Sequence, residues 1–314
     1  MPEVTVSVGG DEHTFDTKKE MLKAVGRAIL SDSEEPMTLR QLYYRFVAMD
    51  LIENKQSQYQ YLGESVKEAR LEGVIPWDWI EDRTRSTDAG DFNDGEYIDP
   101  DDRFEANFQW FKNTPERYHR PKWEDQRNYV EVWVEKEALA GVFANVCEDL
   151  KVVSFPNRGY TSITMLKQAA ERIRDEIGTK VPPSGRHRRA HILYFGDFDP
   201  SGQDIERNIR EKMSETFNVR VNVERVALTR EQIDEFELPP QPAKRTDARY
   251  ESFVEKHGNL AVELDALPPD ELRRLIRESV NEYFDEGWYQ NKIKPKEQKE
   301  REHLRERVDE VICE

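Results

Sequence analysis

The strongest constraint on the fold lies in His191–Ile205, which has the sequence HILYFGDFDPSGQDI. The apolar run His191–Phe195 predicts a buried strand, and a helical pattern follows from about Gln203. Asp197 and Asp199 are two positions apart, so both side chains lie on one side of an extended segment. We therefore expect them at the carboxyl end of the strand, where open α/β sheets bind their ligands.

Two carboxylates this close repel each other, and a cation would neutralise the repulsion. Hard oxygen ligands at a strand end suit Mg²⁺. Pro200 and Gly202 favour a tight turn that lets the helix begin beside the site. The alternative is an ordinary strand-to-helix turn in which an aspartate is the N-cap, because a D-x-D-x-x-G motif by itself is short.

Strand-like and helical segments alternate through the middle of the chain. The expected strands are Tyr129–Val134, Lys151–Phe155, His191–Phe195 and Val219–Ala227, with helical patterns between them. This alternation predicts an α/β fold with a mainly parallel, doubly wound sheet.

Glu135 follows the first of these strands as Asp197 follows the third. Because parallel strands end at one edge of a sheet, we expect Glu135, Asp197 and Asp199 to converge around Mg²⁺. Such a cluster serves phosphoryl transfer, and one carboxylate could instead keep a proton and act as a general acid. The alternative is three unrelated surface acids.

The amino-terminal part has a different pattern. Val4–Val8 and His13–Phe15 flank a glycine turn and predict a hairpin. Three helices are expected after it, over Thr17–Leu30, Thr38–Val47 and Ser57–Glu72.

A β-like excursion with Arg83 and Arg85 follows the third helix. This order is typical of a winged helix-turn-helix, with the third helix in a DNA groove and the arginines on the wing. A small helical domain with ordinary surface arginines is the alternative.

Composition limits the class of protein. The net charge of −17 argues against general nucleic-acid binding but does not exclude a local basic groove. No apolar run reaches the length of a membrane span. The first residues lack the pattern of a signal peptide, and the two cysteines form neither a metal spacing nor a disulfide framework. We therefore expect a cytoplasmic protein with no membrane partner.

Several motifs together resemble one family. They are Val134-Glu135-Lys136-Glu137-Ala138, Gly159-Tyr160, Asp197-Phe198-Asp199-Pro200-Ser201-Gly202, Arg225-Val226-Ala227-Leu228-Thr229, Glu263-Leu264-Asp265-Ala266-Leu267 and Arg40-Gln41-Leu42-Tyr43-Tyr44. Their order is similar to that in the A subunit of type IIB DNA topoisomerases and the related meiotic double-strand-break transesterases, which combine a winged helix with a Toprim domain.

The resemblance implies that Tyr44 is the DNA nucleophile. Arg40 is one helical turn before it and could hold the attacked phosphate. An unperturbed phenol has a pKa of about 10, so Tyr44 needs a nearby cation. Tyr43 is expected to be packed, and the alternative for Tyr44 is likewise a buried core aromatic.

The family also implies a homodimer on double-stranded DNA, in which the tyrosine of one subunit works with the metal site of the other. It further implies an ATPase B-type subunit, of which this chain carries no recognisable part. Expected DNA contacts are Lys55, Arg83, Arg85 and Arg158.

The expected organisation has four segments. Residues 1–87 form the winged-helix domain, 88–128 an acidic linker and aromatic packing segment, 129–268 the Toprim metal-binding domain, and 269–314 a charged helical segment. The expected function is Mg²⁺-dependent DNA cleavage by tyrosine transesterification. The alternatives are a hydrolytic Toprim endonuclease and a non-catalytic DNA-binding relative.

Overall fold

The computed structural model describes residues 4–8, 11–33, 36–81, 99–157, 161–178 and 188–313. The chain divides into two compact units. Unit 1 comprises Met1–Ser86, Val130–Arg174 and Ala190–Glu282, and unit 2 comprises Thr87–Tyr129, Asp175–Arg189 and Tyr283–Glu314. The candidate site residues discussed below belong to unit 1.

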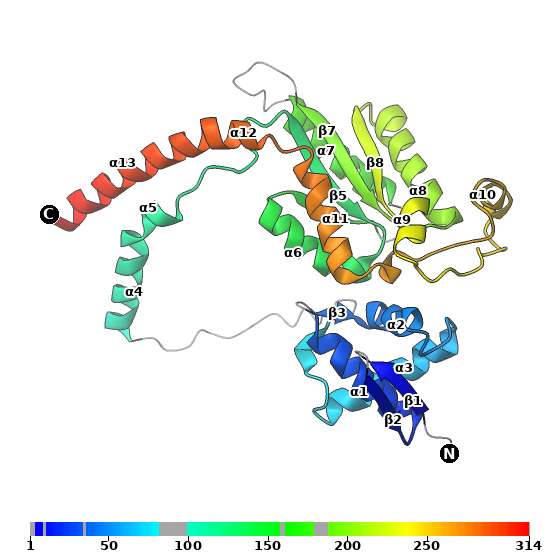
Figure 1. Cartoon of the computed structure of the whole chain (residues 1–314). Coiled ribbons are helices and arrows are strands. Elements are labelled where there is room, and N and C mark those ends of the chain that lie inside the picture. Colours follow the sequence, from blue (N-terminus) through cyan, green and yellow to red (C-terminus); the bar gives the residue numbers. More distant parts are fainter. Residues whose placement is uncertain are drawn as a thin grey trace. The chain divides into compact units, whose positions relative to one another are not determined.

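A four-stranded parallel sheet with the order β6-β5-β7-β8 is the centre of unit 1 (Figure 1). Its strands are β5 (Asn128–Val134), β6 (Val153–Pro156), β7 (Arg189–Phe195) and β8 (Val221–Ala227). The predicted α/β class with a mainly parallel sheet is thereby confirmed, and each strand lies within two residues of its predicted limits. Because helices cover parallel sheets on their faces, β7 ends in an apolar run over residues 192–195, and β5 is apolar from Val130 to Val134 except at Glu131.

Helices follow the strands along this part of the chain. They are α6 (Ala140–Leu150), α7 (Ile163–Gly178), α8 (Pro200–Glu211), α9 (Arg230–Glu235), α10 (Tyr250–His257) and α11 (Pro269–Asn281). Short 3₁₀ turns lie at η3 (Glu137–Leu139) and η5 (Leu264–Ala266), and a π-helical turn, η4 (Lys212–Thr216), extends α8. Helix α6 packs beside β6 and α11, and α8 packs beside β8.

The amino-terminal part of unit 1 begins with the expected hairpin. Its elements are β1 (Val4–Val8), β2 (Asp11–Phe15), α1 (Lys18–Ser31), β3 (Met37–Thr38), α2 (Leu39–Ala48), α3 (Gln56–Leu71), η1 (Trp77–Trp79) and β4 (Ile80–Glu81). Strands β1 and β2 are antiparallel, whereas β3 and β4 form a short parallel pair.

Local capping explains where the first helices begin. The Thr17 hydroxyl accepts the Glu20 amide hydrogen at 3.1 Å. Thr38 and Gln41 form a reciprocal capping box at the start of α2. Thr17 and Thr38 are therefore the N-caps of α1 and α2.

Unit 2 contains α4 (Pro100–Lys112), α5 (Thr114–Arg117), α12 (Glu286–Trp288), the π-helical turn η6 (Tyr289–Ile293) and α13 (Lys294–Cys313). Helix α4 has no buried residue, and its Phe104 and Trp110 side chains are exposed.

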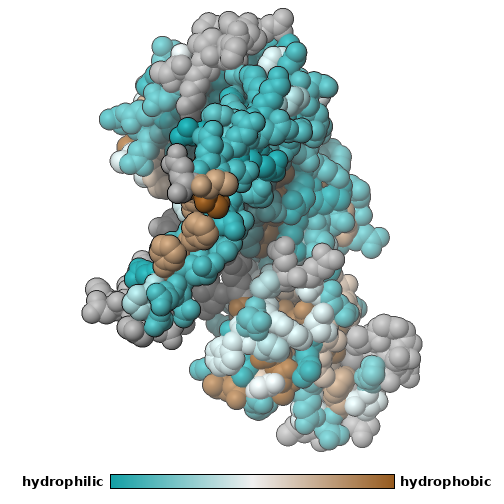
Figure 2. Space-filling model, turned by 90° about the vertical axis from the view of Figure 1, so that its left-hand side faces the viewer, coloured by the Kyte–Doolittle hydropathy of each residue, from teal (hydrophilic) through white to brown (hydrophobic). Residues whose placement is uncertain are grey.

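On the face drawn in Figure 2, hydrophilic residues cover most of the surface, as expected for a chain that is 35% charged.

No helix in the described part of the chain combines the length and the apolar character that crossing a bilayer requires.

Candidate active site

Glu135 and Asp197 meet at the carboxyl edge of the sheet. The Glu135 amide donates to the carbonyl oxygen of Phe195 at 2.8 Å, which continues the alignment of β5 with β7 past the end of β5. The Glu135 Oε2 atom then accepts the Asp197 amide hydrogen at 3.0 Å and the Tyr194 hydroxyl at 3.1 Å. These contacts bring the two predicted site residues together, although they are far apart in the sequence.

Two glycines leave room for this carboxylate. A Cβ atom at Gly196 would lie 2.7 Å from Glu135 Oε2. A Cβ atom at Gly202 would lie 2.3 Å from the Asp197 carbonyl oxygen and 3.1 Å from Glu135 Oε2. At Gly202 the obstruction is backbone, so only a residue without a side chain fits there, whereas a Cβ atom at Gly196 would force the Tyr194 and Glu135 side chains to shift. These glycines permit the close approach of β5 and the loop after β7.

Arg225 on β8 holds the same loop by its backbone. Its guanidinium donates to the carbonyl oxygens of Gly196 at 3.2 Å, Asp197 at 3.3 Å and Gly202 at 2.7 Å. It also pairs with Glu206 at 3.1 Å. Since one planar cation bonds several carbonyls at once, Arg225 stabilises the conformation of the aspartate loop.

Asp197 is buried and already faces a cation of the protein. Its Oδ1 atom accepts the Leu264 amide hydrogen at 2.8 Å and lies 3.3 Å from the Lys136 ammonium. Burial raises the pKa of Asp197 to about 7, against the opposing effect of Lys136 and with a further increase from Glu135. Burial also raises the pKa of Glu135, and the charge of Asp199 adds to this increase.

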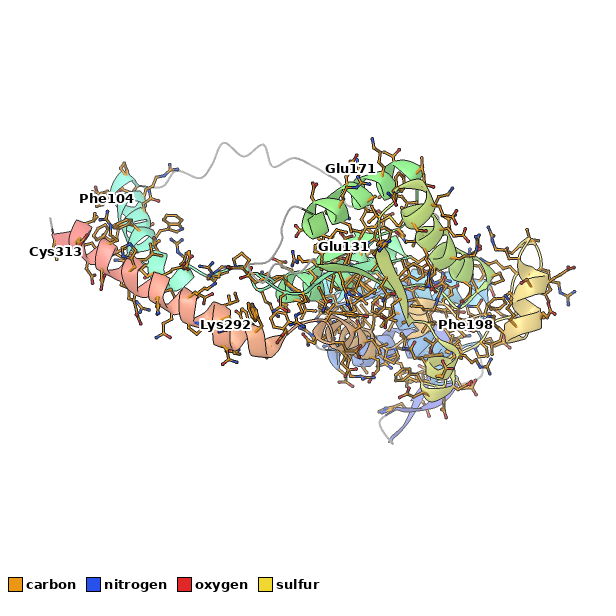
Figure 3. The ribbon with its side chains drawn as sticks, turned by 90° about the horizontal axis from the view of Figure 1, so that it is seen from above. Phe104, Glu131, Glu171, Phe198, Lys292 and Cys313 are labelled. Carbon is orange, nitrogen blue, oxygen red and sulfur yellow. The ribbon has the colours of Figure 1, made fainter. Side chains whose placement is uncertain are left out.

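Asp199 is the N-cap of α8. Its Oδ1 atom accepts the Gly202 amide hydrogen at 2.7 Å, and Pro200 is the first residue of the helix. The interpretation as a capped strand-to-helix turn is therefore correct for this residue. The side chain also lines a pocket of about 50 Å³ together with Asp197 and Glu263. Between the two aspartates, Phe198 (Figure 3) points into the apolar cluster of Phe253 and His257.

Asp197 and Asp199 are the residues whose carboxylates would hold Mg²⁺ at this site. Within the described ranges, no three His, Cys, Asp or Glu side chains are arranged to hold a metal ion. Asp197 and Asp199 both line the pocket, whereas the Glu135 carboxylate is directed at the Asp197 amide. Mg²⁺ commonly binds through one or two carboxylates and retains several waters. Glu263, the third carboxylate of the pocket, is paired with Arg40 and Lys136. Asp197 and Asp199, with Glu135 beside them, are compatible with that mode.

Arg40 of α2 forms an ion pair with Glu263, which directly precedes η5. Its guanidinium donates to both carboxylate oxygens of Glu263 through Nε and Nη2. The Arg40 Nε atom also lies 3.8 Å from Asp265. Lys136 joins the same group, at 2.7 Å from Glu263 and 2.6 Å from Asp265. These charges hold the pKa of Glu263 down at about 2 despite its burial.

Tyr44 lies beside this ionic group and is only 2% exposed. Its hydroxyl accepts a hydrogen bond from Gln241 Nε2 at 2.9 Å. The Arg40 guanidinium lies 5.8 Å from the centre of the Tyr44 ring. Burial raises the pKa of Tyr44 above its ordinary value, and the charge of Glu263 adds to this, while Arg40 opposes it. The hydroxyl is therefore protonated at neutral pH in this arrangement.

Tyr43 has a separate environment. Its hydroxyl donates to Asn54 Oδ1 at 3.1 Å, and its ring packs edge-on against Tyr44 and Tyr59. Tyr43 is thus packed, as predicted, but so is Tyr44.

Of the four expected DNA contacts, the structure places one. Lys55 precedes α3, is exposed, and pairs with Glu53 at 2.7 Å. Arg83, Arg85 and Arg158 lie outside the described residues, as does most of the acidic stretch Asp88–Asp102.

Sequence reasoning assigned no role to five residues that surround the carboxylates. They are Lys136, Arg225, Gln241, Glu263 and Asp265. All of them except Gln241 occur inside the motifs that carry the resemblance. For Lys136 a signal was available, because a charged residue just after an apolar strand needs a partner when it is buried.

No family model matches the sequence, and no curated protein matches it either.

Proposed function

We propose that the protein cleaves double-stranded DNA in a Mg²⁺-dependent transesterification, with an amino-terminal winged helix and a Toprim domain forming unit 1. The observation that carries this proposal is the hydrogen bond between the Glu135 carboxylate and the Asp197 amide at the ends of β5 and β7. It supports a shared carboxylate site at the sheet edge, where α/β folds bind ligands.

In the proposed reaction, the Tyr44 oxygen attacks a DNA phosphorus. The P–O3′ bond breaks, a phosphotyrosine ester forms, and the proton of the tyrosine passes to solvent water. Mg²⁺ at Asp197 and Asp199 would stabilise the charge on the attacked phosphate and the leaving oxygen. Glu135, whose pKa is raised by burial, is suited to hold a proton and give it to the O3′ atom.

Tyr44 requires a change of surroundings before it can attack. Within its own chain the hydroxyl is buried and bonded to Gln241. We therefore propose that a second copy of the chain supplies the carboxylates for this tyrosine, so that DNA lies between two protomers. An ATPase partner of the B type would be needed for strand passage, and cleavage alone does not require it.

The test is incubation of labelled duplex with the full chain and Mg²⁺, followed by denaturation and detection of DNA attached to protein. We expect an adduct with the wild type that is absent from Tyr44→Phe and from Asp197→Ala. Tyr43→Phe is the matched control, because its hydroxyl bonds Asn54 and not Gln241. An adduct that persists in Tyr44→Phe would exclude this nucleophile.

The burial of Tyr44 favours a second candidate function, a hydrolytic Toprim endonuclease in which water attacks and the tyrosine is structural. Under this alternative, Tyr44→Phe still cuts DNA and no adduct forms, whereas Asp197→Ala is inactive. DNA binding by the wild type without cutting in Mg²⁺ would instead support a non-catalytic DNA-binding protein.

A further inference from the structure

A continuous series of ion pairs connects α2, the helix that contains Tyr44, with the carboxylates at the edge of the sheet. It runs from Arg40 to Glu263, from Glu263 to Lys136 at 2.7 Å, and from Lys136 to Asp197 at 3.3 Å. The Arg40 side chain is 33% exposed, that of Glu263 24% and that of Lys136 18%. Partial burial makes each charge dependent on its partner, because water screens such pairs less than surface pairs.

One end of this series of ion pairs has the chemistry of a metal-ion site, and the other end has the chemistry of a phosphate site. At Asp197, the Lys136 ammonium is the positive charge beside a carboxylate proposed to bind Mg²⁺. At Arg40, the two oxygens of Glu263 accept from the guanidinium fork in the manner in which a phosphate accepts from arginine.

We propose that Lys136 and Glu263 are internal substitutes for the metal ion and the DNA phosphate, and that both are displaced when the true ligands bind. This inference rests on the proposed function and adds the residues that regulate its site. Lys136 competes with the ion for Asp197, and Glu263 competes with the phosphate for Arg40.

The direct contact between Lys136 and Glu263 has a further consequence. An ion that removes Lys136 from Asp197 leaves its ammonium with Asp265 and Glu263, where it competes with Arg40 for the Glu263 carboxylate. A phosphate that removes Arg40 leaves Glu263 to Lys136 alone. Each ligand therefore weakens the internal partner of the other, so metal and DNA bind with positive coupling, for which factors of about 5 or more are typical.

The metal end is tested with Mn²⁺ and the full chain in the absence of DNA, by calorimetry or by electron paramagnetic resonance. Lys136→Gln removes the competing charge, and we expect its Mn²⁺ affinity to rise by about fivefold or more. Lys136→Arg keeps the charge and is expected to stay near the wild type. Lys167→Gln is the matched control, because this exposed lysine pairs only loosely with Glu171 at 3.6 Å.

The phosphate end is tested by duplex binding in EDTA, where no cleavage occurs. Glu263→Gln frees Arg40, and we expect tighter DNA binding than in the wild type by a similar factor. The gain should disappear in the double variant Glu263→Gln with Arg40→Ala. Glu171→Gln is the control for the lost negative charge, since Glu171 is exposed. Thermal unfolding of each variant verifies that it is folded.

The outcomes separate the two proposals. Mn²⁺ binding that requires Asp197 but is unchanged or weaker in Lys136→Gln, together with unchanged DNA affinity in Glu263→Gln, overturns the substitution and leaves the proposed function intact. Absence of Mn²⁺ binding in both the wild type and Lys136→Gln overturns both proposals. If the Lys136→Gln chain does not fold, unchanged DNA affinity in Glu263→Gln alone counts against the inference.

Discussion

The side-chain amide of Gln241 donates a hydrogen bond of 2.9 Å to the hydroxyl of Tyr44, which is 197 positions earlier in the chain. Gln241 is itself held by paired backbone hydrogen bonds of 2.8 Å with Ala261. It also lines the pocket that contains Asp197 and Asp199. The tyrosine hydroxyl and the carboxylates are thus connected through one glutamine.

This bond predicts a measurable coupling. Gln241→Ala leaves the buried hydroxyl without its donor, and we expect the free energy of unfolding to fall by about 1–3 kcal/mol. Tyr44→Phe should also destabilise, and the double variant should lose less than the sum by about 0.5–1.5 kcal/mol. Urea unfolding of the four chains gives the coupling. Strict additivity would show that the two side chains do not interact in solution.

Asp197 gives a prediction about pH. Its folded pKa of about 7 exceeds the ordinary value of 3.8, mainly because of burial. Between these values the folded state holds a proton that the unfolded state has lost, so the free energy of unfolding falls as pH rises. Asp197→Asn removes this effect, and in EDTA we expect its melting temperature to exceed that of the wild type more at pH 8 than at pH 5.

Asp247 is the matched control with the opposite sign. Burial raises its pKa, but hydrogen bonds from Ser201 and Arg249 outweigh that and lower it. This carboxylate stabilises the fold above its unfolded pKa, and the contribution is lost as pH falls. Asp247→Asn should therefore lower the melting temperature at pH 8. For Asp197→Asn, a gain in melting temperature over the wild type that is no larger at pH 8 than at pH 5 would contradict the buried environment assigned to Asp197.

Glu131 on β5 supports the sheet rather than the site. Its fully buried carboxylate accepts from Arg172 at 2.8 Å and from the Trp133 indole at 2.9 Å. Removing its charge weakens the two hydrogen bonds that Arg172 donates to it in a partly buried place, so we expect Glu131→Gln to lower the free energy of unfolding by about 2–3 kcal/mol. Glu171 in α7 is the control (Figure 3), and its conversion to Gln should change stability by at most about 0.5 kcal/mol. Equal effects in denaturant unfolding would refute the burial of Glu131.

The two cysteines should differ in reactivity. Cys147 is buried, and burial raises the pKa of its thiol to about 12, whereas Cys313 is exposed near the end of α13. Because the thiolate is the reactive form, a disulfide reagent at pH 8 should modify one thiol per native chain and two after denaturation. Cys313→Ser should abolish the native reaction. Rapid modification of Cys147 in the native chain would mean that α6 is not packed as described.

Much of the local structure was determined by the sequence alone. The apolar run that became β7 and the threonines that cap α1 and α2 carry their own signals, because strand burial and helix capping depend on neighbouring residues. The proximity of Glu135 to Asp197 was also foreseeable. Both follow parallel strands, and such strands end at one edge of a sheet.

Tertiary structure alone decided the electrostatic state of these residues. Arg40 was expected to face a phosphate, yet it binds Glu263, which is 223 positions away. Lys136 was only a motif residue, yet its ammonium lies 3.3 Å from the Asp197 carboxylate. Charge pairing depends on which side chains the fold brings within a few ångströms, and a linear pattern contains no information on such distances. For the same reason, the sequence predicted that Tyr44 lies in a helix, but only the packing of unit 1 determined that the Tyr44 hydroxyl is buried.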